Sequence, residues 1–297
     1  MKSKVKISIA CSAVVAVAAL GAVFWHGGSD KPEVSQSVDV LNPATEPVTE
    51  PELPDITDFS PEPGLTGLAQ AMSQINDDVV GWIRISNTQV DYPVVQYEYD
   101  EENGNDFYLH KDIYGNYLER GTIFMDYRDV FGGDESKQTD NIVLYGHNML
   151  NGSMFGDLHD YRHDEDFYKE NPIIEFSSNY KDYKYVIFAY LLTSGSYGES
   201  YYGEDFPYWD IHDLSKESDF NDYVETVDER SYIHPDIDVE PGDKLLTLST
   251  CHLDEDNSRL LVVARRLRDD ETVESITAKI SGDSADDESE NTDDSDE

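Results

Sequence analysis

Eight short runs of β-type residues, separated by turn residues, are the feature of this sequence that most limits its possible folds. Valine, isoleucine, tyrosine, phenylalanine and threonine are enriched in strands because their side chains pack well on a pleated surface. Short runs at irregular spacing favour a closed barrel or a sandwich over a repeating βαβ sheet. The expected strands are 79–85, 90–95, 121–127, 141–145, 173–176, 185–192, 245–251 and 259–267.

Three segments break this β pattern. Apolar residues at helical spacing predict an amphipathic helix over 65–75, ahead of the first strand. A short helix is expected within 153–163, and a longer one over 215–230, before the strand that ends at Cys251. The chain is therefore predicted to be mainly β, with an N-terminal helix and a helical insertion.

The N-terminus has the pattern of a membrane anchor. Three lysines within residues 1–6 precede an uncharged apolar run over 7–25. About twenty apolar residues span a bilayer as one helix, and flanking lysines stay on the cytoplasmic side. We expect 1–6 to be cytoplasmic, 7–25 to be a single-pass signal-anchor, and the rest of the chain to be extracellular. A cleaved signal peptide is the alternative, but its small-residue site at 16–18 lies inside the apolar run.

Composition divides the remainder of the chain. Spaced prolines among acidic residues predict an extended stalk over 26–64, and the folded domain that contains the β-type runs is expected over 65–270. The strongly acidic segment 271–297 is expected to be a disordered tail. With 63 acidic and 21 basic residues, the net charge is −42, and such a surface repels phosphate backbones. Nucleic acid is therefore excluded as a partner.

Beyond the apolar run the chain has one cysteine, Cys251, so an intramolecular disulfide in the exported part is excluded. Taken alone, such a residue is better explained as a small buried hydrophobe than as a nucleophile. Arg259 opens the next expected strand, which brings a guanidinium near the thiol. A thiolate nucleophile also needs a partner for its proton, usually histidine.

Among eight histidines, His147 stands out because it directly follows the apolar strand run and Gly146, as Cys251 ends its own strand. Two such strand ends meeting at one barrel rim would place imidazole near sulfur. His159 and His163 lie one helical turn apart, but they lack the glutamate of an HExxH motif and a third ligand. The acidic cluster 254–256 lacks EF-hand spacing, so no metal site and no cofactor are expected.

These motifs together resemble the sortases. They are Thr-Leu-Ser-Thr-Cys at 247–251, Arg-Leu-Leu-Val-Val-Ala-Arg from 259, and Leu-Tyr-Gly-His-Asn-Met at 144–149. Segments 78–83, 90–96, 108–110 and 121–126, and the helical insertion, are similar to class B members. The resemblance covers roughly 65–267.

The resemblance implies an eight-stranded β-barrel enzyme, a membrane-anchored cysteine transpeptidase of the Gram-positive cell surface. Such an enzyme cleaves a C-terminal sorting signal after Thr and joins the new carboxyl group to an amine. By motif, Cys251 would be the nucleophile, His147 the general acid and base, and Arg259 the stabiliser of the oxyanion or substrate backbone. The implied partners are surface proteins with an NPxTx- or LPxTG-like signal, and an amine of a peptidoglycan cross-bridge or a pilin lysine.

Three further residues are candidate substrate contacts. Ser249 shares the strand face of Cys251 by alternation, so it is expected to face the cleft. Asn105 and Leu109 occupy a position that resembles the class B signal-binding helix or loop, although packing or loop capping explains all three equally well. Class B members often have an acidic residue just after the cysteine, whereas this chain has His252.

Two alternatives to a transpeptidase follow from the same residues. A cysteine hydrolase or protease on this scaffold needs the same thiol, imidazole and oxyanion donor, so it stays open. No papain-like Cys-Gly-Ser-Cys-Trp motif is present, which weighs against conventional cysteine proteases. A non-catalytic binding module is disfavoured because Cys251, His147 and Arg259 are all retained.

Overall fold

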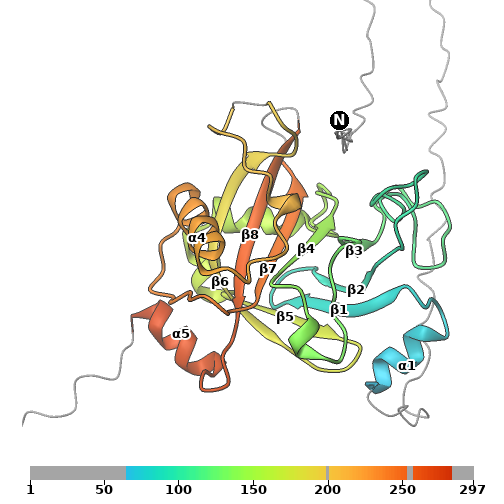
Figure 1. Cartoon of the computed structure of the whole chain (residues 1–297), viewed down its shortest axis with the longest axis horizontal. Helices are drawn as coiled ribbons and strands as arrows, with labels where there is room; N and C mark the ends of the chain where they lie inside the picture. The colour runs from blue at the N-terminus through green and yellow to red at the C-terminus, as the bar shows by residue number, and fades with distance from the viewer. Residues whose placement is uncertain (1–64, 199–200, 253–256, 283–297) are drawn as a thin grey trace, which may run out of the picture. The chain divides into compact units, whose positions relative to one another are not determined.

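The computed structural model describes residues 65–198, 201–252 and 257–282, which form a closed eight-stranded barrel with helices on its outer side (Figure 1). The strand order around the barrel is β1-β2-β3-β4-β7-β8-β6-β5. β2 pairs with β3 and β4 pairs with β7 in parallel, and the other neighbours are antiparallel. The strands are β1 (Val79–Ile85), β2 (Asp91–Val95), β3 (Ile123–Met125), β4 (Asn141–Gly146), β5 (Ile173–Ser178), β6 (Lys184–Ser194), β7 (Leu245–Cys251) and β8 (Ser258–Arg266).

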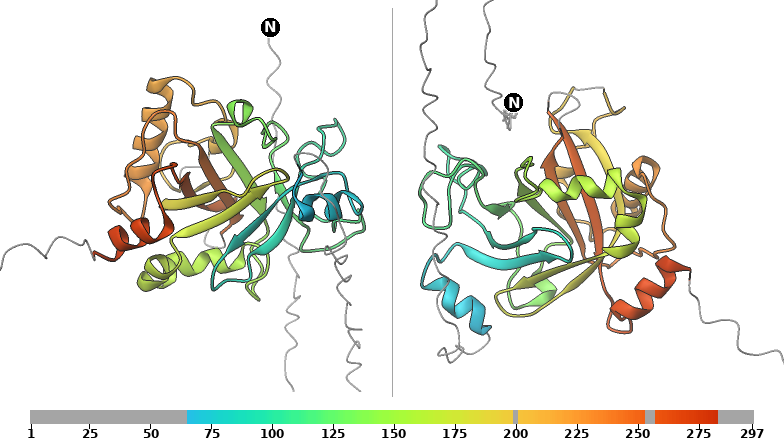
Figure 2. Two further views of the ribbon diagram at one scale, coloured as in Figure 1. Left: turned by 90° about the horizontal axis from the view of Figure 1, so that it is seen from below. Right: turned by 180° about the vertical axis from the view of Figure 1, so that it is seen from behind.

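The helices lie outside the barrel. All views in Figures 1 and 2 place α1 on the opposite side of the barrel from α4 and α5. The α-helices are α1 (Gly67–Ser73), α2 (Asp160–His163), α3 (Glu165–Glu170), α4 (Glu217–Arg230) and α5 (Val273–Ser281). Short 3₁₀ turns are η2 (Glu135–Lys137), η3 (Gly156–His159) and η4 (Tyr208–Asp210).

Strands such as β7 are buried on both faces, and their successive side chains enter two different apolar clusters. In β7, Leu246 and Leu248 join a cluster that draws on all eight strands and fills the barrel. Leu245 points the other way and joins an outer cluster with Phe220 and Val227 of α4. The outer cluster explains why helical segments are needed at all: they cover apolar surface that a bare barrel would expose to water.

The prediction of a mainly β chain is confirmed, and the barrel is the correct choice over a sandwich. The largest difference in a strand is β3, which covers three residues of the run expected at 121–127. Gly121 has φ +60°, outside the extended region, and the Asp126 side chain accepts from the backbone N–H of Arg128 to form a turn. Both ends of the run are thus removed from the ladder.

Helical predictions were right for 65–75 and 215–230, but incomplete elsewhere. The segment 153–163 is helical only from Gly156, and the following α3 was not predicted. The prediction of a disordered tail from 271 onward was wrong for α5, which begins with a capping box between Thr272 and Ser275. Ile276 of α5 is buried, so apolar packing holds this helix to the domain. The rest of the predicted tail, 283–297, lies outside the described residues.

The predicted cytoplasmic, anchor and stalk segments, together 1–64, also lie outside the described residues. Within residues 65–282, leaving out the two short gaps, no helix has the length and apolar character needed to cross a bilayer.

An ion pair ties the segment just ahead of α5 to the barrel and gives a test of this fold. Arg265 of β8 is buried and donates from both terminal nitrogens to the Glu271 carboxylate, at 2.6 and 2.8 Å. Glu271→Gln should lower the free energy of unfolding at pH 7 by about 3 kcal/mol, because the guanidinium loses its charge partner. Glu274→Gln, at an exposed position in the first turn of α5, is the matched control and should leave the free energy of unfolding nearly unchanged.

The two variants are compared by urea unfolding at several pH values. The hydrogen bonds with Arg265 hold the pKa of Glu271 below its ordinary value. The carboxylate therefore stabilises the fold fully above the unfolded-state pKa of about 4.3, and this stabilisation is lost as the pH falls through the lower folded-state pKa. Equal unfolding free energies for the two variants at pH 7 would contradict this role of Glu271.

Candidate active site

Cys251 and Arg259 face each other across two antiparallel strands. Cys251 is the last residue of β7 and is paired with Arg259 of β8. Residues directly opposite in an antiparallel pair project to the same face of a sheet. Arg259 is buried, and its Nη1 donates to the Ser258 carbonyl at 2.9 Å. The strand pairing thus brings the guanidinium to the same side of the barrel as the thiol.

His147 reaches Cys251 through the parallel pairing of β4 with β7. The two strands are in register to their ends, where Gly146 pairs with Thr250. The Thr250 hydroxyl donates to the Gly146 carbonyl at 2.9 Å, which fixes the register at its last step. His147 and Cys251 are the next residues along the two strands. The predicted meeting of two strand ends at one rim is therefore what the fold produces.

The His147 ring is held from the loop between β2 and β3. Its Nε2 lies 2.9 Å from the Leu109 carbonyl oxygen, and its ring stacks on His110 at a centroid distance of 5.1 Å. Since a carbonyl only accepts, Nε2 carries a proton and Nδ1 has none in the neutral ring. Burial lowers the pKa of His147, and the hydrogen bond to the Leu109 carbonyl opposes this effect.

Two glycines leave the room that this arrangement needs. A Cβ on Gly146 would come within 2.4 Å of the Ile123 side chain and 2.6 Å of the Phe155 ring. A Cβ on Gly195 would lie 2.8 Å from the guanidinium carbon of Arg259. Neither glycine has a positive φ, so close packing rather than backbone conformation requires them.

Asn105 and Leu109, the predicted substrate contacts outside the cysteine strand, lie in the same loop. Leu109 approaches His147 through its carbonyl, while its side chain packs against the outer apolar cluster. The Asn105 side chain accepts from the Tyr127 N–H at 3.0 Å and lies 3.4 Å from an Asp126 carboxylate oxygen. The structure thus brings Leu109 to the site and uses Asn105 to close its loop onto the end of β3.

Ser249 shares the outer face of β7 with Cys251, as alternation predicted, but it is buried beneath Tyr208. The two hydroxyl groups are 2.7 Å apart. Tyr208 lies in η4, within the long connection between β6 and β7. Burial raises the pKa of its phenol, and the charge of Arg259 opposes this effect. Ser249 therefore supports a covering residue that the sequence analysis did not identify. The aromatic density of Phe-Pro-Tyr-Trp at 206–209 was the available signal for it.

A partly buried ionic cluster fixes this covering segment to the barrel. Arg128 donates to Asp126 and to Asp210, each at 2.8 Å, and also to the Trp209 carbonyl. A second contact joins His212 Nδ1 to Asp129 at 2.6 Å. Burial opposes protonation of His212, but the hydrogen bond and charge of Asp129 prevail and raise its pKa. Nothing in the sequence next to His212 indicates a buried carboxylate 83 positions away.

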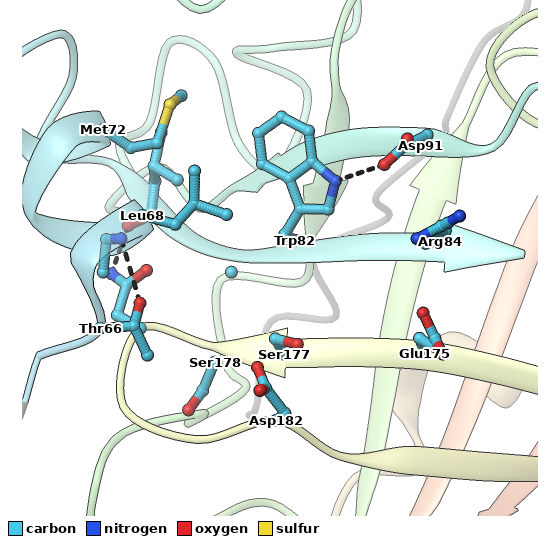
Figure 3. A pocket seen from close by; sticks show the side chains of 14 residues that line it. Thr66, Leu68, Met72, Trp82, Arg84, Asp91, Glu175, Ser177, Ser178 and Asp182 are labelled. Carbon is cyan, nitrogen blue, oxygen red and sulfur yellow. Dashed lines mark hydrogen bonds between the residues drawn. The ribbon is translucent and has the colours of Figure 1, made fainter. Parts of the chain in front are cut away.

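The described residues contain no group of three or more His, Cys, Asp or Glu side chains that could hold a metal ion. A pocket of about 380 Å³ lies under α1, against β1 and β5 (Figure 3). In it, the Trp82 indole N–H donates to Asp91 at 2.7 Å. Its lining includes none of Cys251, His147 and Arg259, so it is separate from the candidate active site.

Comparison with known proteins gives one consistent answer. A family model described as a sortase domain matches residues 83–267. Sortase B of Listeria monocytogenes is 34% identical over 186 residues, which cover 62% of this chain and 67% of that protein. Sortase B of Staphylococcus aureus is 30% identical over 201 residues, covering 67% of this chain and 74% of that protein.

Solved structures agree. A Staphylococcus aureus sortase B–substrate complex superposes with a TM-score of 0.58 at 29% identity, covering 69% of this chain and 87% of that one. Clostridium perfringens sortase B gives a TM-score of 0.57 at 28% identity, covering 67% and 99%. The family match spans more than half of the chain, and the barrel carries a cysteine, a histidine and an arginine at adjoining strand ends. The chain therefore belongs to the sortase family of cysteine transpeptidases, in class B.

Proposed function

We propose that this protein cleaves a C-terminal sorting signal after Thr, through a thioester on Cys251, and transfers the acyl group to an amine. One observation carries the proposal. The in-register parallel pairing of β4 with β7 makes His147 and Cys251 neighbours, while the antiparallel pairing of β7 with β8 puts Arg259 opposite the thiol. Nucleophile, acid–base group and cation are thus all set by backbone ladders, not by mobile side chains alone.

In the acylation step, the Cys251 thiolate attacks the Thr carbonyl carbon, and a C–S bond forms as the carbonyl electron pair moves to oxygen. Arg259 stabilises the oxyanion, since a guanidinium stays charged and donates in a fork. The intermediate collapses with cleavage of the C–N bond. His147, as imidazolium, gives its proton to the leaving amine. The products are a thioester, a free amine and a neutral imidazole.

In the transfer step, the amine acceptor attacks the thioester carbonyl. His147 takes the proton that the amine loses, and the C–S bond breaks to release the Cys251 thiolate. The site then holds thiolate and imidazolium again, so protons balance over the cycle. Because Nε2 of His147 is bonded to the Leu109 carbonyl, Nδ1 is the nitrogen that exchanges protons with the amines.

The reactive ion pair is a minority form of this site. An ordinary thiol has a pKa of about 8.5 and an ordinary imidazole about 6.5, so thiol and neutral imidazole predominate at neutral pH. Burial lowers the pKa of His147 further, so the difference between the pKa of the thiol and that of the imidazole becomes larger. We therefore expect slow turnover, limited by the fraction of enzyme in the thiolate–imidazolium form.

The proposed substrates are surface proteins with an NPxTx- or LPxTG-like signal, and the acceptor is an amine of peptidoglycan or of a pilin lysine. Leu109 and Asn105 are proposed to contribute to substrate binding as parts of the β2–β3 loop, which lies beside His147. For Ser249 we propose an indirect part, through its hydrogen bond to Tyr208. We further propose that 7–25 anchors the enzyme in the membrane, with 26–64 as stalk; the lysines and apolar run of the sequence support this.

The transpeptidase activity is tested with the full-length protein in detergent, peptides of both signal types, and added amines. Mass spectrometry should find the peptide cleaved after Thr and ligated to the amine. Cys251→Ala should abolish both cleavage and ligation. Cleavage that no amine diverts from hydrolysis would support the cysteine hydrolase instead, and cleavage that persists in Cys251→Ala would contradict both mechanisms.

Arg259→Lys tests the oxyanion role. The variant keeps the positive charge but loses the fork of donors, so kcat should fall about 100-fold, as expected for loss of a preorganised oxyanion donor. Arg84→Lys, at an exposed position on β1, is the matched control and should keep wild-type kcat. Near-normal turnover in Arg259→Lys would remove this residue from the catalytic set.

A further inference from the structure

A pair of stacked histidines, His159 and His252, adjoins the backbone of Cys251, the proposed nucleophile. Nε2 of His159, the last residue of η3, is 3.3 Å from the Cys251 carbonyl oxygen. The His159 ring stacks on the ring of His252, with centroids 5.0 Å apart and planes inclined by 18°. The sequence pattern around His159 gives it neither a metal-binding nor a catalytic role, yet the structure makes it a neighbour of Cys251.

The stack has a defined orientation because Arg162 holds its far side. Nη1 of Arg162 lies 2.6 Å from Nε2 of His252. A guanidinium only donates, so Nε2 of His252 accepts and the ring proton of neutral His252 is on Nδ1. Arg162 also lies over the Tyr232 ring, 5.7 Å from its centroid, within the range of a cation–π contact. One line of contacts therefore runs from α2 through two imidazoles to the backbone of Cys251.

His252 is itself fixed to the β7–β8 hairpin. Its N–H donates to the Ser258 carbonyl at 2.9 Å, and the Ser258 hydroxyl donates to the His252 carbonyl at 2.8 Å. The next pair along this hairpin is Cys251 with Arg259. The stacked histidines are thus attached to the hairpin at the His252–Ser258 pair, which is next to the pair formed by Cys251 and Arg259.

The surroundings keep His159 neutral. Burial is the main effect, and it lowers the pKa of His159 from its ordinary value. The hydrogen bond to the Cys251 carbonyl opposes this effect. A neutral ring with its proton on Nε2 donates one hydrogen bond to that carbonyl and adds no charge beside the thiol.

We propose that His159 is a positioning residue for the nucleophile: its Nε2–H holds the Cys251 carbonyl, and His252 with Arg162 holds the imidazole plane that makes this contact. The inference rests on the proposed role of Cys251. One segment therefore approaches Cys251 twice. It begins after β4 with His147, the proposed acid–base partner of Cys251, and it ends at His159, which hydrogen-bonds to the Cys251 carbonyl.

Loss of the hydrogen bond from His159 to the Cys251 carbonyl should lower the rate of turnover and leave binding of the signal peptide unchanged. His159→Leu removes the donor, and kcat should fall about 10- to 100-fold with KM for the signal peptide little changed, because a misplaced nucleophile loses near-attack geometry. His159→Gln retains an N–H donor of similar reach and should recover most of kcat. His163→Gln, an exposed histidine one turn away, is the matched control and should equal the wild type.

A second readout tests positioning without turnover. The rate of Cys251 alkylation by iodoacetamide is measured in the same four proteins, with the modified peptide identified by mass. It should fall on the order of tenfold in His159→Leu and recover in His159→Gln, because the displaced thiol loses its imidazole partner. Wild-type kcat and alkylation in His159→Leu, or equal losses in the Leu and Gln variants, would overturn the proposal.

Different results would contradict the transpeptidase function and the positioning role of His159. If the wild-type protein transfers no acyl group, or Cys251→Ala still cleaves, the proposed function is wrong. The alkylation rates still decide whether His159 positions the thiol. If transfer by the wild type is normal and His159→Leu matches it in both assays, only the positioning role is wrong.

Discussion

The in-register parallel pairing of β4 with β7 is the constraint on which the rest of this structure depends. It brings two strand ends, far apart in the sequence, to one rim, where Gly146 pairs with Thr250 and the next residues are His147 and Cys251. A slip of one residue would turn every side chain of one strand to the opposite face. Apolar side chains on both faces of β7 resist such a slip, since each set fits a different cluster.

Around this pairing, three loop segments hold the site through hydrogen bonds. The β2–β3 loop supplies the Leu109 carbonyl that fixes the tautomer of His147. The β6–β7 connection is fastened by Arg128 and covers the cysteine strand with Tyr208. The β4–β5 connection returns to Cys251 through His159. Side chains at a strand end are otherwise free to move, so these contacts are what would hold nucleophile and base at reacting distance.

Much of this arrangement was predictable from sequence, for reasons that also show where prediction fails. Cys251, His147 and Arg259 each adjoin a β-type run, so their placement follows from strand periodicity and the resemblance to sortases. His159, Tyr208 and His212 owe their positions to partners 41 to 92 residues away, which no local pattern reports. Acidic composition concealed α5, although Thr272 and Ser275 carry its capping signal.

The pairing of β4 with β7 brings residues 147 and 251 side by side, and disulfide formation in the variant His147→Cys tests this placement. Adjacent residues on paired strands have Cα atoms within the roughly 4.4–6.8 Å that a disulfide spans. Under mild oxidation, mass mapping should find the introduced thiol joined to Cys251 within one chain, whereas the control His163→Cys should leave Cys251 open to alkylation. An oxidised His147→Cys protein whose Cys251 is still fully alkylated would contradict the account.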